Sequence, residues 1–174
     1  MHKTNLRGSS MPRLSAAGVS SLAAEDVKST VVLGIDPGRH TGLAWYRGAK
    51  LVELLTVAPE QLVPILQSTD ITTVVFEDSR KTRHTWGRGP ASVGAMRKIA
   101  RNVGQIDAWC IQIEVLCKTC GIACIGLSPR EKGAKVSPND FARITGFQGR
   151  SNQHERDAAM VAWPFRAMRK ATQH

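Results

Sequence analysis

Three carboxylates and one imidazole stand at positions from which they could bind a metal ion together. Asp36 and Glu77 each end an apolar run, VVLGID and TVVFE, that is typical of a buried strand. His154 and Asp157 are three residues apart, so a helix presents them on one face. A buried carboxylate needs a compensating charge, and Mg²⁺ prefers clustered carboxylate oxygens. The pattern predicts a magnesium site.

Each of these residues, taken alone, also has an ordinary explanation. Asp36 precedes the glycine turn PGRHTG and could cap it, and Glu77 or Asp78 could cap the turn after the fourth strand. Asp157 could form an ion pair with Arg156 or Arg150, and His154 could be a surface residue of the first helical turn. The shared metal site is favoured because three acids at the ends of apolar elements are hard to explain as solvated charges.

The elements that must position these residues follow one another in a mixed α/β order. Apolar, β-rich runs predict five strands, at 31–36, 42–47, 50–57, 71–78 and 122–127. The first three form an antiparallel meander because only tight turns join them. A crossover helix at 59–67 makes the fourth strand parallel to the first. Asp36 and Glu77 then lie at the same edge of a five-stranded mixed sheet flanked by helices.

The remaining helices are predicted from three- and four-residue spacing and from capping signals. A helix over 92–119 has an apolar stripe and is expected to cover one face of the sheet. That stripe consists of Ile99, Val103, Ile106, Trp109, Cys110, Ile113 and Cys117. Residues 129–140 are predicted as a polar connection, followed by a short helix at 141–145. A last helix begins near Asn152, which forms a capping-box pattern with Glu155, and is interrupted at Pro164.

Composition and charge favour a polyanionic partner. The chain has 174 residues, 42% of them hydrophobic, and a formal net charge of +10. Such a charge favours nucleic acid, because lysine and arginine release condensed counterions when they neutralise phosphates. No apolar run approaches the roughly 20 residues that span a bilayer, so we expect no membrane partner. The predicted phosphate track consists of Arg80, Lys81, Arg83, Arg88, Arg97, Lys98 and Arg101, with Trp86 stacking on a base.

Domain organisation and compartment follow from composition as well. Residues 1–29 are rich in Ser, Ala and Gly and are predicted to be a flexible basic leader, with an organelle transit peptide as a minor alternative. Residues 30–174 then form one domain. The four cysteines lie within 110–124 among apolar residues, which favours buried thiols over a zinc site or disulfides. We therefore expect an intracellular protein, cytoplasmic or associated with the nucleoid.

Four motifs in this order resemble the RuvC-type Holliday-junction resolvases of the ribonuclease H-like superfamily, in a divergent or phage-like version. They are GIDPGRHTG at 34–42, the strand ending in Glu77, GIACIGLSPRE at 121–131 and HERDAA at 154–159. The resemblance covers about residues 31–163. One departure is the segment SRKTRH after the fourth strand, where the family often carries an aromatic wedge for opening the junction.

The resemblance implies a ribonuclease H-like fold and a metal-dependent endonuclease. It implies paired symmetric cleavage of four-way DNA junctions by a homodimer, an activity of DNA recombination and repair. The metal ligands would be Asp36, Glu77, His154 and Asp157, holding two Mg²⁺ ions that Mn²⁺ can replace. Lys135 is our first choice for the catalytic lysine, and Lys132, otherwise assigned to DNA binding, is the second. The helix at 92–119 is the expected dimer contact, through apolar area left at Trp109, Ile113 and Leu116.

Three other functions compete with junction resolution. One is a nuclease of the same fold that acts on flaps or structured RNA. Another is a catalytically inactive DNA-binding module that recognises branched structure. The third, a sugar kinase or actin-like ATPase, shares the D-x-G turn but needs two such domains, and the chain is too short for them. Mg²⁺-dependent cleavage of a four-way junction, compared with duplex, flap and RNA hybrid, separates the first two from the main hypothesis.

Overall fold

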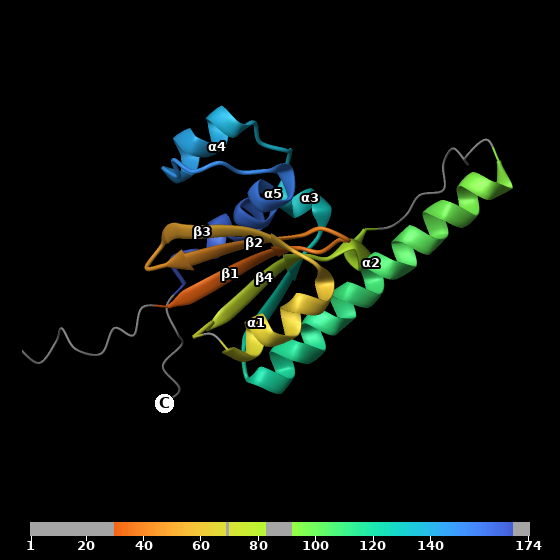
Figure 1. Ribbon diagram of the computed structural model, residues 1–174, viewed down its shortest axis with the longest axis horizontal. Helices are drawn as coiled ribbons and strands as arrows, with labels where there is room; N and C mark the ends of the chain where they lie inside the picture. The colour runs from red at the N-terminus through yellow and green to blue at the C-terminus, as the bar shows by residue number, and fades with distance from the viewer. Residues whose placement is uncertain (1–29, 69, 83–91, 169–174) are drawn as a thin grey trace, which may run out of the picture.

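A five-stranded mixed sheet forms the centre of the computed structural model, which describes residues 30–68, 70–82 and 92–168. The strand order is β3-β2-β1-β4-β5 (Figure 1). The strands are β1 (Val31–Asp36), β2 (Thr41–Arg47), β3 (Lys50–Val57), β4 (Thr73–Glu77) and β5 (Ala123–Leu127). All five predicted strands are confirmed, with ends shifted by at most two residues. The predicted leader, 1–29, and Arg83, Trp86 and Arg88 of the predicted track lie outside the described residues.

The register of the sheet brings two of the predicted acids to one edge. β1 pairs with β2 in antiparallel register, with Asp36 opposite Gly42. β1 pairs with β4 in parallel register, with Ile35 opposite Phe76. Asp36 and Glu77 are the next residues along these two strands, so they leave the sheet side by side. The predicted parallel pairing of the first and fourth strands is therefore confirmed.

Helices cover both faces of the sheet. Successive side chains of a strand point to opposite faces, and β1 separates accordingly: Val31, Leu33 and Ile35 lie in one apolar cluster and Val32 in another. The first cluster contains buried residues of α1 (Leu62–Ser68) and α2 (Val93–Cys120). The second contains the alanines of α5 (Gln153–Ala162). Figure 1 shows α5 on one side of the sheet and α1 and α2 on the other.

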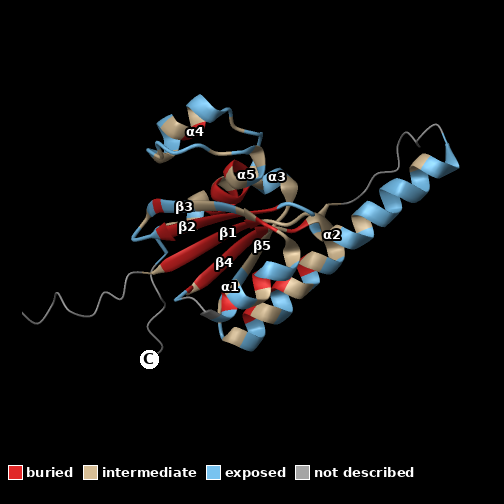
Figure 2. Cartoon of the chain, viewed as in Figure 1, coloured by how far each residue is buried: buried red, intermediate tan, exposed pale blue. Residues whose placement is uncertain are grey.

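The long helix α2 covers the sheet only with its C-terminal half. Cys110, Ile113 and Cys117 are fully buried, but Met96 and Ile99 are 44% and 45% exposed. The prediction that the whole apolar stripe packs on the sheet is wrong for its first part. A helix of 28 residues is about 42 Å long, whereas a strand of five residues spans only about 17 Å. The N-terminal half extends past the sheet, as Figure 2 shows.

The segment predicted as a polar connection contains two helical starts. α3 (Pro129–Lys132) begins inside it, and α4 (Pro138–Thr145) begins three residues earlier than predicted. Each helix follows a serine N-cap with proline at the first helical position, a standard start signal that apolar periodicity does not reveal. The described residues also form three short 3₁₀ helices, η1 (Pro59–Gln61), η2 (Ser79–Lys81) and η3 (Trp163–Phe165), the last at the predicted interruption.

Candidate active site

The four predicted metal-site residues line one cavity at the edge of the sheet. Asp36 and Glu77 come from the ends of β1 and β4, and His154 and Asp157 come from α5. The cavity has a volume of about 480 Å³. Its other lining residues are Pro37, Gly38, Ser79, Ile106, Lys132, Lys135 and Gln153. Residues separated by more than 100 positions in the chain therefore face the same space.

Two glycines let α5 approach the sheet closely enough to bring its two residues to this edge. A Cβ atom on Gly34 of β1 would lie 2.1 Å from the carbonyl oxygen of Ala158. A Cβ atom on Gly42 of β2 would lie 2.1 Å from the carbonyl oxygen of His154. Any other residue at these positions would push the helix away, because carbon and oxygen cannot approach so closely. Asn152 caps the helix by accepting a hydrogen bond from the backbone N–H of Glu155, as the sequence pattern predicts.

His154 and Asp36 are joined by a hydrogen bond across the cavity. His154 Nδ1 lies 2.9 Å from Asp36 Oδ2, so the tautomer protonated at Nδ1 donates to this carboxylate. Burial raises the pKa of Asp36 above its ordinary value, although the His154 hydrogen bond and the Lys132 charge act in the opposite direction. The imidazole is 48% exposed, so it can meet a ligand in the cavity while it orients the carboxylate.

Lys132 lies inside the acid cluster. Its ammonium forms an ion pair with Glu77 Oε2 and lies 3.5 Å from Asp157 Oδ1, and its side chain is 9% exposed. Burial alone would lower the pKa of Lys132, but the hydrogen bond and charge of Glu77, with Asp157 and Asp36, raise it. From sequence, Lys132 was predicted as a DNA contact and as the second choice for the catalytic lysine, but its ion pairs with Glu77 and Asp157 were not predicted. The Ser-Pro start signal of α3, which places Lys132 at the end of that short helix, was the available clue.

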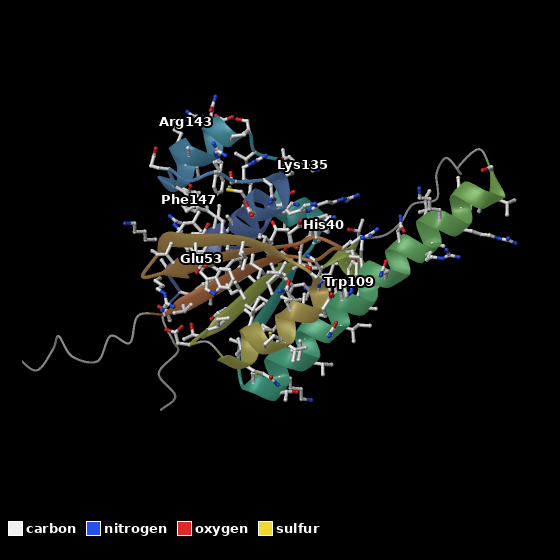
Figure 3. The ribbon with its side chains drawn as sticks, viewed as in Figure 1. His40, Glu53, Trp109, Lys135, Arg143 and Phe147 are labelled. Atoms are coloured by element: carbon white, nitrogen blue, oxygen red, sulfur yellow. The ribbon has the colours of Figure 1, made fainter. Side chains whose placement is uncertain are left out.

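Lys135, the preferred catalytic lysine, lines the same cavity but forms no ion pair with any residue that the structure describes. Figure 3 labels it with His40 and Trp109. The two lysines therefore differ in whether the ammonium group is paired with a carboxylate. Lys132 neutralises the carboxylates, whereas Lys135 presents a free charge at the cavity.

The donor atoms suit a hard divalent cation by type. Three carboxylates and an imidazole face one cavity. Carboxylate oxygens bind such ions, whereas imidazole is more typical of transition-metal sites. Over residues 30–68, 70–82 and 92–168, however, no three His, Cys, Asp or Glu side chains stand close enough to coordinate one ion. Lys132 supplies the positive charge between Glu77 and Asp157, and Gln153 Nε2 donates to Asp157 Oδ1 at 3.0 Å. By type the donor set suits a metal ion, whereas in this structure the charges of Glu77 and Asp157 are compensated by Lys132.

Arg80, the first residue of the predicted phosphate track, is engaged within the protein. Its guanidinium donates to both carboxylate oxygens of Asp78, which is buried, and to Glu114 of α2. Asp78 lies two residues before Arg80 in the chain, whereas Glu114 is 34 residues away and could not be paired with it from sequence. Lys81 Nζ donates to the carbonyl oxygen of Gly126 at 2.6 Å. Arg80 therefore links η2 to α2, and its guanidinium is engaged within the protein and not available as the predicted phosphate contact.

Two further predictions concern the remaining arginines and lysine of the phosphate track and the alternative ion pair of Arg156 with Asp157. Arg97, Lys98 and Arg101 are exposed on the protruding half of α2. Arg156 is buried and donates to the carbonyl oxygens of Val136 and Ser151, so the alternative pairing with Asp157 is not found.

The four cysteines are free thiols, as predicted, but they are not all buried. Cys110 and Cys117 are buried, whereas Cys120 is half-buried and Cys124 is exposed on β5. The edge position of β5 explains this exposure. Within the described residues these cysteines form no zinc site. None of the described helices is long and apolar enough to cross a bilayer.

Comparison with known proteins shows the fold. No family model matches the chain, and no curated protein matches it in sequence. Two solved structures of RuvC from Thermus thermophilus are similar, each with 17% sequence identity over 77% of this chain. One, solved in complex with a Holliday junction substrate, is covered over 90% of its length with a TM-score of 0.53. The other is covered over 92% with a TM-score of 0.51. The chain therefore has the RuvC-like, ribonuclease H-type fold.

Proposed function

We propose that this protein is a metal-dependent endonuclease that resolves four-way DNA junctions. The observation that carries the proposal is the convergence of Asp36, Glu77, His154 and Asp157 on one cavity at the edge of a RuvC-like sheet. The net charge of +10 supports a nucleic-acid substrate. The junction-bound RuvC structure supports branched DNA within that class.

The three carboxylates and His154 would hold Mg²⁺, two ions in our proposal, and Mn²⁺ would suit the same donors. When bound, divalent ions activate a water molecule and stabilise the leaving oxygen in phosphodiester hydrolysis. His154 orients Asp36 through its hydrogen bond. Lys132 contacts both Glu77 and Asp157 in the structure, and with a metal bound to these carboxylates it would be available, like Lys135, to contact the scissile phosphate. The carboxylates would then be compensated by Lys132 when no metal is bound and by the metal when it is bound.

The DNA surface extends from the cavity onto the protruding half of α2. Arg97, Lys98 and Arg101 are exposed there, and no ion pair engages them among the described residues. They are suited to phosphate contacts, which position a duplex arm without reading its sequence. Arg83, Trp86 and Arg88, just before this helix, remain part of the proposal.

Symmetric resolution needs two active sites, and the described part of the chain carries one such acid cluster. We therefore propose a homodimer about a two-fold axis. The dimer contact predicted from sequence cannot be formed by Ile113 and Leu116, because Ile113 is fully buried and Leu116 packs against the core. The exposed apolar residues Val93, Met96 and Ile99 of α2 provide the surface instead. Light scattering at micromolar concentration should give a dimer mass, and a Met96→Glu, Ile99→Glu double variant should give a monomer.

The decisive experiment is cleavage of a four-way junction with Mg²⁺, compared with matched duplex, flap and RNA hybrid. We expect paired symmetric cuts in the junction only. Asp36→Asn should abolish cleavage and leave junction binding intact, because the basic surface supplies the affinity. Glu53→Gln, a change of the same kind at an exposed position of β3, is the control. Preference for the flap or hybrid would establish a different nuclease, and binding without any Mg²⁺-dependent cut would establish a non-catalytic module.

A further inference from the structure

A second cavity lies beside the candidate active site. It has a volume of about 560 Å³, within the range of about 300–1,000 Å³ that is usual for small-molecule sites. Its lining comes from the β1–β2 turn, the segment after β3 and the middle of α2. The residues are Arg39, His40, Ala58, Pro59, Glu60, Gln105 and Trp109. None of them belongs to the acid cluster or to the proposed phosphate track.

The two cavities adjoin each other through shared elements. The turn that supplies Arg39 and His40 to the second cavity supplies Gly38 to the first. Ile106 of α2 lines the first cavity, between Gln105 and Trp109 in the chain. The His40 ring centroid lies 6.3 Å from that of His154. A strand with one phosphate at the acid cluster therefore has a neighbouring nucleotide within reach of the second cavity.

The lining provides the chemical groups that a single nucleotide needs. Trp109 is a half-buried aromatic side chain that lines the cavity, and every base has a face that can stack on one. Arg39 is exposed and forms no ion pair with the described residues, so its charge is available for a phosphate. Gln105 and Glu60 offer amide and carboxylate groups for hydrogen bonds to a base edge. Ala58 and Pro59 add apolar surface.

We propose that this cavity holds one unpaired nucleobase of the cleaved strand, next to the scissile phosphate. The proposal rests on the nuclease function proposed above and deepens it. The base stacks on Trp109, Arg39 contacts its phosphate, and Gln105 and Glu60 contact its polar edge. A continuous duplex keeps its bases stacked and paired, so this site favours DNA that is open at a branch point. Contacts to the base edge also make the position next to the cut sensitive to sequence.

Binding to abasic junctions tests this proposal without depending on cleavage. In the Asp36→Asn background, a series of four-way junctions carries one abasic site at each position near the branch point. We expect one position to weaken binding by between about 5-fold and 150-fold, the range that corresponds to about 1–3 kcal/mol of stacking per base. Trp109→Ala should produce a similar loss with the intact junction. Combined with the sensitive abasic site, it should produce little further loss.

Control variants separate stacking from a structural effect. Trp109→Phe should keep most of the affinity because it retains an aromatic face. Ile111→Ala, at a 51% exposed position two residues away on α2, should not change it. Thermal unfolding verifies that the variants fold. The proposal is overturned if the losses from Trp109→Ala and each abasic site simply multiply, or if Trp109→Ala weakens duplex binding equally.

The nuclease function and the base pocket can fail separately. A wild-type chain that binds the junction but never cuts it overturns the nuclease function, while the abasic series still decides the pocket. A chain that cuts junctions but shows no sensitive abasic position overturns only the pocket. Absence of junction binding overturns both.

Discussion

Replacing Gly42 by alanine tests how the active site is assembled. The new Cβ atom would lie 2.1 Å from the carbonyl oxygen of His154 and 2.9 Å from the backbone nitrogen of Glu155, both in the first turn of α5. These are backbone atoms, so no side-chain rotation relieves the contact. The first turn must retreat from β2 by roughly 1 Å to restore van der Waals distance. His154 and Asp157 retreat with it, away from Asp36 and Glu77.

The expected losses follow from that displacement. Overpacking of this kind costs about 1–3 kcal/mol, which corresponds to a fall in Tm of about 2–12 °C for a protein of this size. A displacement of about 1 Å between catalytic groups can cost about 100-fold in rate. Junction binding measured without divalent ions should be unchanged, because no proposed DNA contact moves. Urea or thermal unfolding and single-turnover cleavage measure these effects.

The same substitution at Gly104 is the control. Gly104 lies in the exposed half of α2, and a Cβ atom there would meet nothing within 4 Å. Alanine in a helix interior is about 1 kcal/mol more favourable than glycine, so Gly104→Ala should raise Tm while Gly42→Ala lowers it. If Gly42→Ala kept wild-type stability and rate, the close approach of α5 would not position the site, and the reasoning would be refuted.

Three further predictions concern polar groups. Lys132→Met should lower Tm in EDTA and enlarge the Tm increase produced by Mg²⁺, because two carboxylates lose their counter-ion; an increase equal to that of Lys135→Met would contradict this. Arg80 lowers the pKa of Asp78 below 3.8 through a hydrogen bond, so the ion pair stabilises the fold above about pH 4 and the stabilisation is lost as pH falls further. Asp78→Asn should reduce the loss of unfolding free energy at acid pH, measured by urea unfolding at several pH values. An unchanged dependence of the unfolding free energy on pH would count against this prediction. Tyr46→Phe should cost about 1–3 kcal/mol, because the hydroxyl donates to a buried carbonyl of α5 at 2.9 Å; wild-type stability would show that water replaces this bond.

Local patterns in the sequence were sufficient for the sheet and for part of the site. The positions of the strands, the parallel pairing of the first and fourth, and the capping box at Asn152 depend on short-range periodicity, connection rules and turn chemistry. The placement of Asp36 and Glu77 at one edge follows from that pairing, because both residues end their strands. The assignment of His154 and Asp157 to the same site came from the family resemblance and from their helical spacing.

Tertiary packing decided the features that depend on distant segments. The ion pairs of Arg80 with Glu114 and of Lys132 with Glu77 join residues 34 and 55 positions apart, and no local pattern encodes their meeting. The length of the sheet decided how much of α2 is covered, although its apolar stripe continues past that limit. The cavity at Trp109 exists because the β1–β2 turn, the segment after β3 and α2 meet. Periodicity specifies the face a residue occupies on its own element, whereas packing between elements specifies what that face meets.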